Sequence, residues 1–184
     1  LKLYDCCPFS DGASSVILCS EKFAKENGGD YIEVIGSGRG GSPAALQGRE
    51  HLTTIPSTKI AAEAAYKMAG ITAKDIDFAE VHDCFTIAEV VDTEDLGFFE
   101  KGKGVVAVRE GRTRLNSDIS INPSGGLKSK GHPIGATGIG QVVEVFDQLT
   151  GNAGARTVKD AKIGLTHNFG ATGASCAVHV FQSV

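Results

Sequence analysis

Seventeen residues, Asn122–Gly138, constrain this chain more than any others. They combine five glycines and two prolines and lead directly into an apolar-periodic helix at Ile139–Leu149. Glycine and proline at this density predict a backbone that bends through conformations that a β-carbon would forbid. A loop of small residues before a helix N-terminus lets a ligand approach the backbone closely. His132 lies in this loop and carries a ring that can titrate near neutral pH, so we expect the rest of the chain to support this histidine or to form a wall that faces it.

The charge and cysteine content exclude several classes of protein. A net charge of −4 argues against a general surface for nucleic acid or anionic membranes. No apolar run approaches the length of a membrane span, so no span is predicted. The five cysteines form no disulfide framework, which favours reduced thiols and a cytoplasmic location, with peroxisomes and mitochondria as open alternatives. The first residue is Leu rather than Met, which suggests a fragment of a longer protein.

Short runs of β-branched and apolar residues alternate with helical patterns along the chain. The last run is largely apolar on both faces, which is typical of a strand that is covered on two sides. We predict an α/β fold in which helices cover both faces of a sheet and the last two strands form a hairpin-like pair. The expected strands are Ala13–Cys19, Tyr31–Ile35, Asp77–Val81, Asp118–Ile121, Ile163–His167 and Ala174–Val184. The expected helices are Glu21–Asn27, Lys59–Ala69 with Ser57 as its N-cap, Thr86–Leu96 and Ile139–Leu149.

A second glycine-rich stretch, Gly36–Gly41, follows an expected strand and matches the G-x-G-x-x-G pattern of dinucleotide-binding loops. Such a site also needs an acidic ribose ligand at a strand end about 20 residues further on. That position falls within the alanine-rich segment Ser57–Gly70, which is predicted to be helical. We therefore prefer a plain glycine loop to a nucleotide site.

Three loops bring polar groups that could converge: His82-Asp83-Cys84, His132 and the segment His167–Gly170. Cys84 near His82 suggests a nucleophile with its base, and the alternative is a small buried apolar residue. The glycines and proline around His132 favour a fixed functional ring over an ordinary hydrogen-bonded loop histidine. A zinc site made of His82, Cys84 and His132 is a weaker hypothesis, because no pair has metal-ligand spacing.

Two motifs resemble the thiolase superfamily. Lys130–Gly138 is similar to the thiolase G-H-P-x-G-A-T-G loop, and Asn122–Gly126 is similar to the segment before it. His82–Phe85 matches the H-D-C-F variant of thiolases of the sterol-carrier-protein type, where many thiolases have N-E-A-F. The resemblance runs over the whole chain. It implies that residues 30–184 are the C-terminal βαβαβαββ half of a five-layer α/β/α/β/α thiolase-like body, and that residues 1–29 are the last strand and helix of the N-terminal thiolase domain.

The chain departs from the family pattern at two cysteines. The acylated nucleophile of the family lies upstream of Leu1, and none of the five cysteines matches it. Asn168-Phe169-Gly170 stands where many thiolases have C-x-G, so the acid–base thiol of that motif is missing. In the sterol-carrier-protein type, the position of Cys84 is thought to take over that work, which agrees with the H-D-C-F motif.

The resemblance implies a reaction of lipid metabolism: thiolysis of a 3-oxoacyl-CoA, or the reverse Claisen condensation. Both directions pass through an acyl-cysteine intermediate. It implies that His132 deprotonates the missing nucleophile, and that His132 and His82 donate hydrogen bonds to the thioester oxygen. Cys84 would move the proton at the α-carbon, and the Gly170 backbone N–H would help to hold the oxyanion. A coenzyme A thioester is then the substrate, without a cofactor or metal. The expected partners are acyl-CoA or CoA, together with copies of the chain in a homodimer or tetramer, or the missing N-terminal half.

Two other interpretations stay open. A thiolase-like half without its nucleophile suits a non-catalytic accessory or scaffold subunit that binds acyl-CoA or a partner enzyme, although His82, Cys84 and His132 are intact. Another superfamily member, such as a ketoacyl synthase or hydroxymethylglutaryl-CoA synthase, is disfavoured by H-D-C-F followed by G-H-P-I-G-A-T-G.

Overall fold

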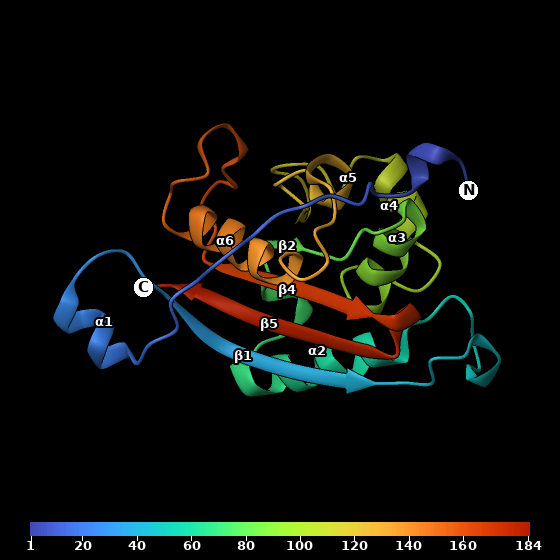
Figure 1. Ribbon diagram of the computed structural model, residues 1–184, viewed down its shortest axis with the longest axis horizontal. Coiled ribbons are helices and arrows are strands. Elements are labelled where there is room, and N and C mark those ends of the chain that lie inside the picture. The colour runs from blue at the N-terminus through green and yellow to red at the C-terminus, as the bar shows by residue number, and fades with distance from the viewer.

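The fold is built around one five-stranded sheet, seen in the computed structural model that describes all 184 residues (Figure 1). The strands lie in the order β1-β5-β4-β2-β3. β5 pairs antiparallel with both β1 and β4, whereas β2 pairs in parallel with both β4 and β3. The strands are Ile32–Gly41 (β1), Phe78–Glu80 (β2), Ser120–Ile121 (β3), Ile163–Gly170 (β4) and Ser175–Ser183 (β5).

The order of elements along the chain confirms the expected βαβαβαββ pattern. Helix α2 joins β1 to β2, α3 lies between β2 and β3, α6 lies between β3 and β4, and a tight turn joins β4 to β5. The parallel strands need helical crossovers, because the end of one strand lies far from the start of the next. The helices are Glu21–Asn27 (α1), Pro56–Ala69 (α2), Thr86–Asp95 (α3), Gly104–Arg109 (α4), Gly126–Lys130 (α5) and Thr137–Leu149 (α6).

Helix α2 covers one face of the sheet, and three glycines of β1 permit this contact. A β-carbon on Gly36, Gly38 or Gly40 would overlap carbonyl oxygens of the α2 backbone. The glycines therefore let the helix lie directly against the strand, where its alanines join the main apolar core. The prediction of a glycine loop after Ile35 is wrong, because Gly36–Gly41 continues β1. The G-x-G-x-x-G match reflects this helix packing, and no α-helix begins directly after it as a phosphate site would require.

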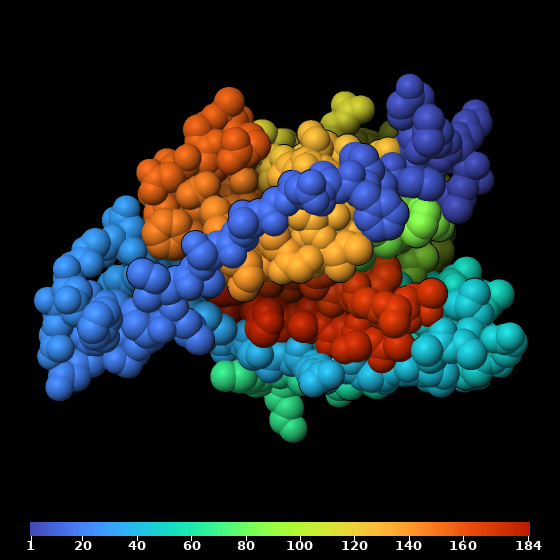
Figure 2. All heavy atoms as spheres, in the orientation of Figure 1, coloured from blue at the N-terminus to red at the C-terminus, as the bar shows by residue number.

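Helix α6 covers the opposite face. Phe78, Val145 and Phe181 form a second, smaller core at this face. Successive residues of a strand point to opposite faces, so Phe78 belongs to this core while Ala79 joins the larger core. In Figures 1 and 2 the extended chain before α1 crosses the outside of α6. None of the helices combines the length and the apolar character needed to cross a membrane.

Most predicted elements are confirmed, and the differences have local reasons. The segment Ala13–Cys19 is not a strand, because its backbone pairs with no strand and its side chains are exposed. Ser57 is not an N-cap, because α2 already begins at Pro56 and the Ser57 hydroxyl donates to the Gly173 carbonyl at 2.6 Å. The bent loop expected over Asn122–Gly138 contains the short helix α5, and a further short helix, α4, lies where no element was predicted. The hairpin-like pairing of the last two strands is confirmed.

Candidate functional site

Two histidines from separate segments meet at the end of β2. His82 follows β2 closely, and His132 lies in the loop between α5 and α6. Their ring centroids are 5.0 Å apart, and the ring planes are nearly perpendicular at 77°. Phe169 near the end of β4 packs against His82, with ring centroids 4.7 Å apart. The structure therefore brings together all three segments that the sequence singled out.

Asp83 links the turn of His82 to the loop of His132. Its carboxylate accepts hydrogen bonds from the backbone N–H of Leu127 at 2.8 Å and of Lys128 at 3.4 Å, in the first turn of α5. Gly126 lies against this carboxylate with a φ of 63°, where a β-carbon would overlap the oxygens. The sequence did not predict this role of Asp83, because a side chain that caps a helix in a distant segment leaves no local pattern.

The first nine residues form hydrogen bonds with the same two segments. Cys7 donates its backbone N–H to the carbonyl of Cys84 at 3.0 Å, and His132 donates its own N–H to the carbonyl of Pro8 at 2.9 Å. The Lys128 ammonium donates to the carbonyl of Cys6 at 3.1 Å. One extended segment therefore holds the backbone near both histidines, a contribution that the sequence patterns did not predict.

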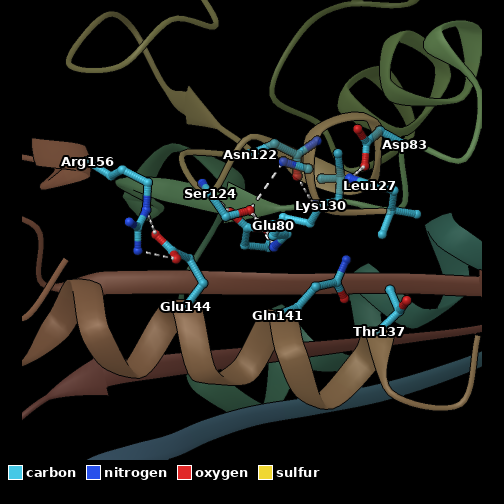
Figure 3. Close-up of polar contacts among 12 residues, drawn as sticks. Glu80, Asp83, Asn122, Ser124, Leu127, Lys130, Thr137, Gln141, Glu144 and Arg156 are labelled. Atoms are coloured by element: carbon cyan, nitrogen blue, oxygen red, sulfur yellow. Dashed lines mark hydrogen bonds and ion pairs between the residues drawn. The ribbon is translucent and has the colours of Figure 1, made fainter. Parts of the chain in front are cut away.

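A buried carboxylate supports the loop that carries His132. Glu80 in β2 is 1% exposed and accepts hydrogen bonds from the Ser124 backbone N–H at 3.0 Å and hydroxyl at 2.6 Å. The Lys130 ammonium lies 3.5 Å from the same carboxylate and 2.6 Å from the Ser124 hydroxyl (Figure 3). Burial raises the pKa of Glu80, whereas Lys130 and Ser124 oppose that rise. Because a buried carboxylate needs such partners, this group holds Lys130 in place two residues before His132.

The surroundings keep the histidine pair uncharged. Burial, followed by the neighbouring His132, lowers the pKa of His82 to about 4. Burial also lowers the pKa of His132, and the Asp83 carboxylate opposes this shift. Nδ1 of His132 lies 2.7 Å from the Thr137 hydroxyl, and Nε2 makes no hydrogen bond within the chain. A neutral, half-buried ring with one free nitrogen is suited to accept a proton.

Cys84 lies two residues after His82, but its surroundings raise the pKa of its thiol overall. Burial raises the pKa of its thiol to about 12, and Asp92 and Cys7 add to the shift. Desolvation disfavours the thiolate, so in this chain the thiol stays protonated at neutral pH. In this environment Cys84 is a neutral thiol that can give a proton.

In the third segment, His167–Gly170, the histidine lies in the core. His167 is completely buried, and its Nε2 lies 2.9 Å from the Thr58 hydroxyl of α2. Its Nδ1 lies 3.6 Å from a carboxyl oxygen of Asp92. This contact is not an ion pair, because burial lowers the pKa of His167 to about 3 and raises the pKa of Asp92 well above its ordinary value. His167 is thus a core residue, whereas Gly170 is exposed and has open space where a β-carbon would lie.

Two hollows flank the loop of His132. The more open one, of about 370 Å³, lies between residues 10–14 and 133–136. The other, of about 180 Å³, lies between β2, α5 and α6, and its polar lining includes Glu80, Asp83, Lys130, Thr137 and Gln141. The zinc hypothesis is not supported, because no group of three His, Cys, Asp or Glu side chains is placed where it could hold a metal ion.

Comparison with known families matches residues 38–183 to the thiolase C-terminal domain-like family. The chain belongs to this family. The thiolase domain is 51% identical to an acetyl-CoA acetyltransferase of Methanothermobacter thermautotrophicus over 182 residues, which are 99% of the chain and 48% of that relative. It is 40% identical to sterol carrier protein 2 of Homo sapiens, over 95% of the chain and 33% of that relative. The thiolase domain therefore spans half the length or less of the curated relatives it matches.

A solved structure gives the same fold. The Ltp2-ChsH2(DUF35) aldolase superposes on the thiolase domain with a TM-score of 0.75, over 84% of this chain and 40% of that chain. At 19% identity this likeness concerns the fold alone. Together with the family match, it confirms the thiolase-like α/β fold that the H-D-C-F and G-H-P-I-G-A-T-G motifs implied.

Proposed function

We propose that this chain is the C-terminal part of a thiolase that transfers an acyl group between CoA thioesters. The reaction is thiolysis of a 3-oxoacyl-CoA or the reverse Claisen condensation. The observation that carries the proposal is the meeting of His82 and His132, whose rings lie 5.0 Å apart although they come from distant segments. The 51% identity to an acetyl-CoA acetyltransferase supports it. The coenzyme A thioester is the substrate, and no resident cofactor or metal takes part.

In the proposed reaction His132 takes the proton of a nucleophilic cysteine in an N-terminal half outside this chain. The thiolate attacks the C3 carbonyl of the 3-oxoacyl-CoA, the C2–C3 bond breaks, the enolate of acetyl-CoA leaves, and an acyl-cysteine remains. The thiol of a CoA molecule then takes the acyl group, and the released cysteine recovers its proton from His132. His82, kept neutral by burial, donates an N–H to the thioester oxygen as negative charge develops there. The Gly170 N–H serves the oxyanion of the tetrahedral intermediate. Donors of this kind are each worth about 2.7–4 kcal/mol in a transition state.

We propose that Cys84 exchanges the proton at the substrate α-carbon. The thioester acidifies this position, and the neutral thiol of the structure, with a pKa of about 12, is the form that returns a proton to an enolate. The opposite step removes the α-proton and needs the thiolate. The proposal therefore requires the pKa of Cys84 to fall in the complete site.

Two half-reactions of a full-length protein containing this chain separate these roles. His132→Ala should slow acetylation by acetyl-CoA by about 10²–10⁴-fold, because no base activates the nucleophile. Cys84→Ala should accept the acetyl group and then fail to condense it or to cleave acetoacetyl-CoA, because only those steps move an α-proton. Intact-protein mass after mixing with acetyl-CoA, beside the steady-state rate, measures both. His51→Ala, which removes an exposed histidine away from the site, is the matched control and should retain both half-reactions.

The assignment of Cys84 is contradicted if Cys84→Ala is not acetylated or keeps nearly full turnover. The assignment of His132 is contradicted if His132→Ala is acetylated at the wild-type rate.

We further propose that residues 1–29 end the N-terminal thiolase domain and that residues 30–184 form the C-terminal one. On this proposal the isolated chain is inactive and binds a second polypeptide. That partner is the N-terminal half, or another copy in a homodimer or tetramer. Ile17, Leu18 and Ile134 are exposed, at 90%, 85% and 67%, as expected for a surface that a partner covers. Sedimentation of the chain as a monomer that binds no apolar dye contradicts this proposal, as does acetoacetyl-CoA cleavage by the chain alone.

A second candidate is a non-catalytic accessory subunit that binds acyl-CoA or a partner enzyme. The observation that favours it is the Cys84 thiol, which burial holds far from its reactive state. A full-length protein that binds acetoacetyl-CoA, but is neither acetylated nor able to cleave it, would establish this role and exclude the enzyme.

A further inference from the structure

We infer that Thr137 is a positioning residue for His132: its hydroxyl keeps the proton of the neutral imidazole on Nδ1 and leaves Nε2 free to accept a proton. The catalytic consequence rests on the proposed function, in which His132 is the base. The position of the proton itself is a property of this chain and can be measured without activity.

The Thr137 hydroxyl lies between the ring and a backbone carbonyl. It is 2.7 Å from Nδ1 of His132 and 3.2 Å from the carbonyl oxygen of Pro133. A hydroxyl has one proton to donate, and a carbonyl oxygen can only accept. If the hydroxyl donates to Pro133, its lone pair accepts the Nδ1–H of His132, and both contacts are hydrogen bonds. If it donates to Nδ1 instead, the contact with Pro133 joins two acceptors, which is less favourable.

The two side chains have little freedom to separate. Thr137 is 6% exposed and is the first residue of α6, and its β-branched side chain has few rotamers in a helix. The backbone of His132 is held by its N–H, which donates to the Pro8 carbonyl at 2.9 Å, and its ring packs against His82. The hydrogen bond between Nδ1 and the hydroxyl is therefore present before any substrate binds.

The groups near Thr137 are compatible with proton transfer to Nε2 of His132. Thr137 and Gln141 project from the first turns of α6 toward the loop of Lys130, and they line the cavity of about 180 Å³ (Figure 3). Asp83, which also lines that cavity, acts to raise the pKa of His132. After Nε2 accepts a proton, the Nδ1–H still donates to Thr137, so the transfer needs no rearrangement of the ring. The titratable groups that line this cavity or contact the loop and its ring are Glu80, His82, Asp83, Lys128 and Lys130.

Imidazole ¹⁵N chemical shifts of the 184-residue chain, followed across neutral pH, measure the position of the proton. We expect neutral His132 to carry it on Nδ1. Thr137→Val removes the hydroxyl but keeps the shape, and should move the neutral ring toward the Nε2–H form, whereas Thr137→Ser should retain the wild-type signal. Thr150→Val is the matched control, because Thr150 follows the other end of α6 and its hydroxyl also donates to a carbonyl four residues earlier. It should change nothing at His132.

A wild-type His132 that carries its neutral-state proton on Nε2 overturns the inference, even if Thr137→Val does not fold. An unchanged tautomer in a folded Thr137→Val also overturns it. In the full-length protein we expect Thr137→Val to slow acetylation about tenfold, and Thr137→Ser to restore most of the rate. If only His132→Ala slows acetylation, the catalytic part of the inference is wrong. If the tautomer is as expected but neither Thr137→Val nor His132→Ala slows acetylation, the positioning stands and the proposed function fails.

Discussion

The histidine pair His82–His132 and the buried contact of His167 with Asp92 lie in the same domain but in different surroundings. Burial lowers the pKa of His82 to about 4 and that of His167 to about 3. His132 is half-buried and keeps Nε2 free, whereas both nitrogens of His167 face core side chains. The loop between α5 and α6 leaves a ring nitrogen of His132 available, and the interior of β4 leaves none of His167. A lowered pKa alone therefore does not mark a functional histidine.

The largest difference between His132 and His167 should appear in the rate of acetylation. In a full-length protein containing this chain, His132→Ala should slow acetylation by about 10²–10⁴-fold, the usual contribution of a positioned base. The free energy of unfolding should change by less than about 1 kcal/mol, because the side chain is half-buried. Acetylation kinetics and urea unfolding of the same variant measure the two effects. A large loss of stability with full activity would reverse the comparison.

His167→Ala should show the opposite behaviour. Removing a completely buried ring leaves a cavity and takes a partner from the Thr58 hydroxyl. We expect the free energy of unfolding to fall by about 3 kcal/mol. Urea unfolding of the chain measures this, with His51→Ala at an exposed position as the control, which should change stability by less than about 0.5 kcal/mol. A His167→Ala variant as stable as the wild type would show that His167 does not support the core.

The same two buried rings predict how stability depends on pH. The folded-state pKa values of His82 and His167, about 4 and about 3, lie below the unfolded value, so the unfolded state binds more protons in this window. Stability is therefore present above the unfolded pKa of about 6.5 and is lost as the pH falls. At about pH 5 each ring should cost about 2 kcal/mol relative to neutral pH.

His167→Gln should remove about 2 kcal/mol of this loss between about pH 7 and pH 5, whereas His132→Gln should remove much less. Urea unfolding over this pH range measures the slopes. Equal slopes for the wild type and His167→Gln would contradict the burial of a neutral His167.

The smallest effect should come from Asp92, the partner of His167. Burial, followed by Asp95 and Glu89, raises the pKa of Asp92 well above its ordinary value. The stability that this group contributes is present below the unfolded pKa and is lost as the pH rises through the folded pKa. Asn cannot ionise, so Asp92→Asn should lose less stability with rising pH and exceed the wild type by about 1 kcal/mol near pH 8. Urea unfolding near pH 4 and pH 8 tests this, and a variant that is less stable than the wild type at both would contradict it.

The sequence by itself determined the order of elements and the segments of the site. Apolar periodicity depends on neighbouring residues, so α2, α3, α6, β4 and β5 could be predicted to within a few residues. The glycines and prolines of Asn122–Gly138 predicted the bent loop, and the motifs H-D-C-F and G-H-P-I-G-A-T-G were sufficient to indicate the family.

Only the tertiary structure decided what depends on contacts between distant residues. Gly36–Gly41 is a strand rather than a loop because its backbone pairs with β5 while α2 packs on it, and residues 13–19 are not a strand because no neighbour pairs with them. The cap that Asp83 places on α5, the contact of Thr137 with His132 and the raised pKa of Cys84 all follow from burial and partners. Hydrogen-bond partners and desolvation are set by which segments meet in space, and sequence spacing alone does not record which segments meet.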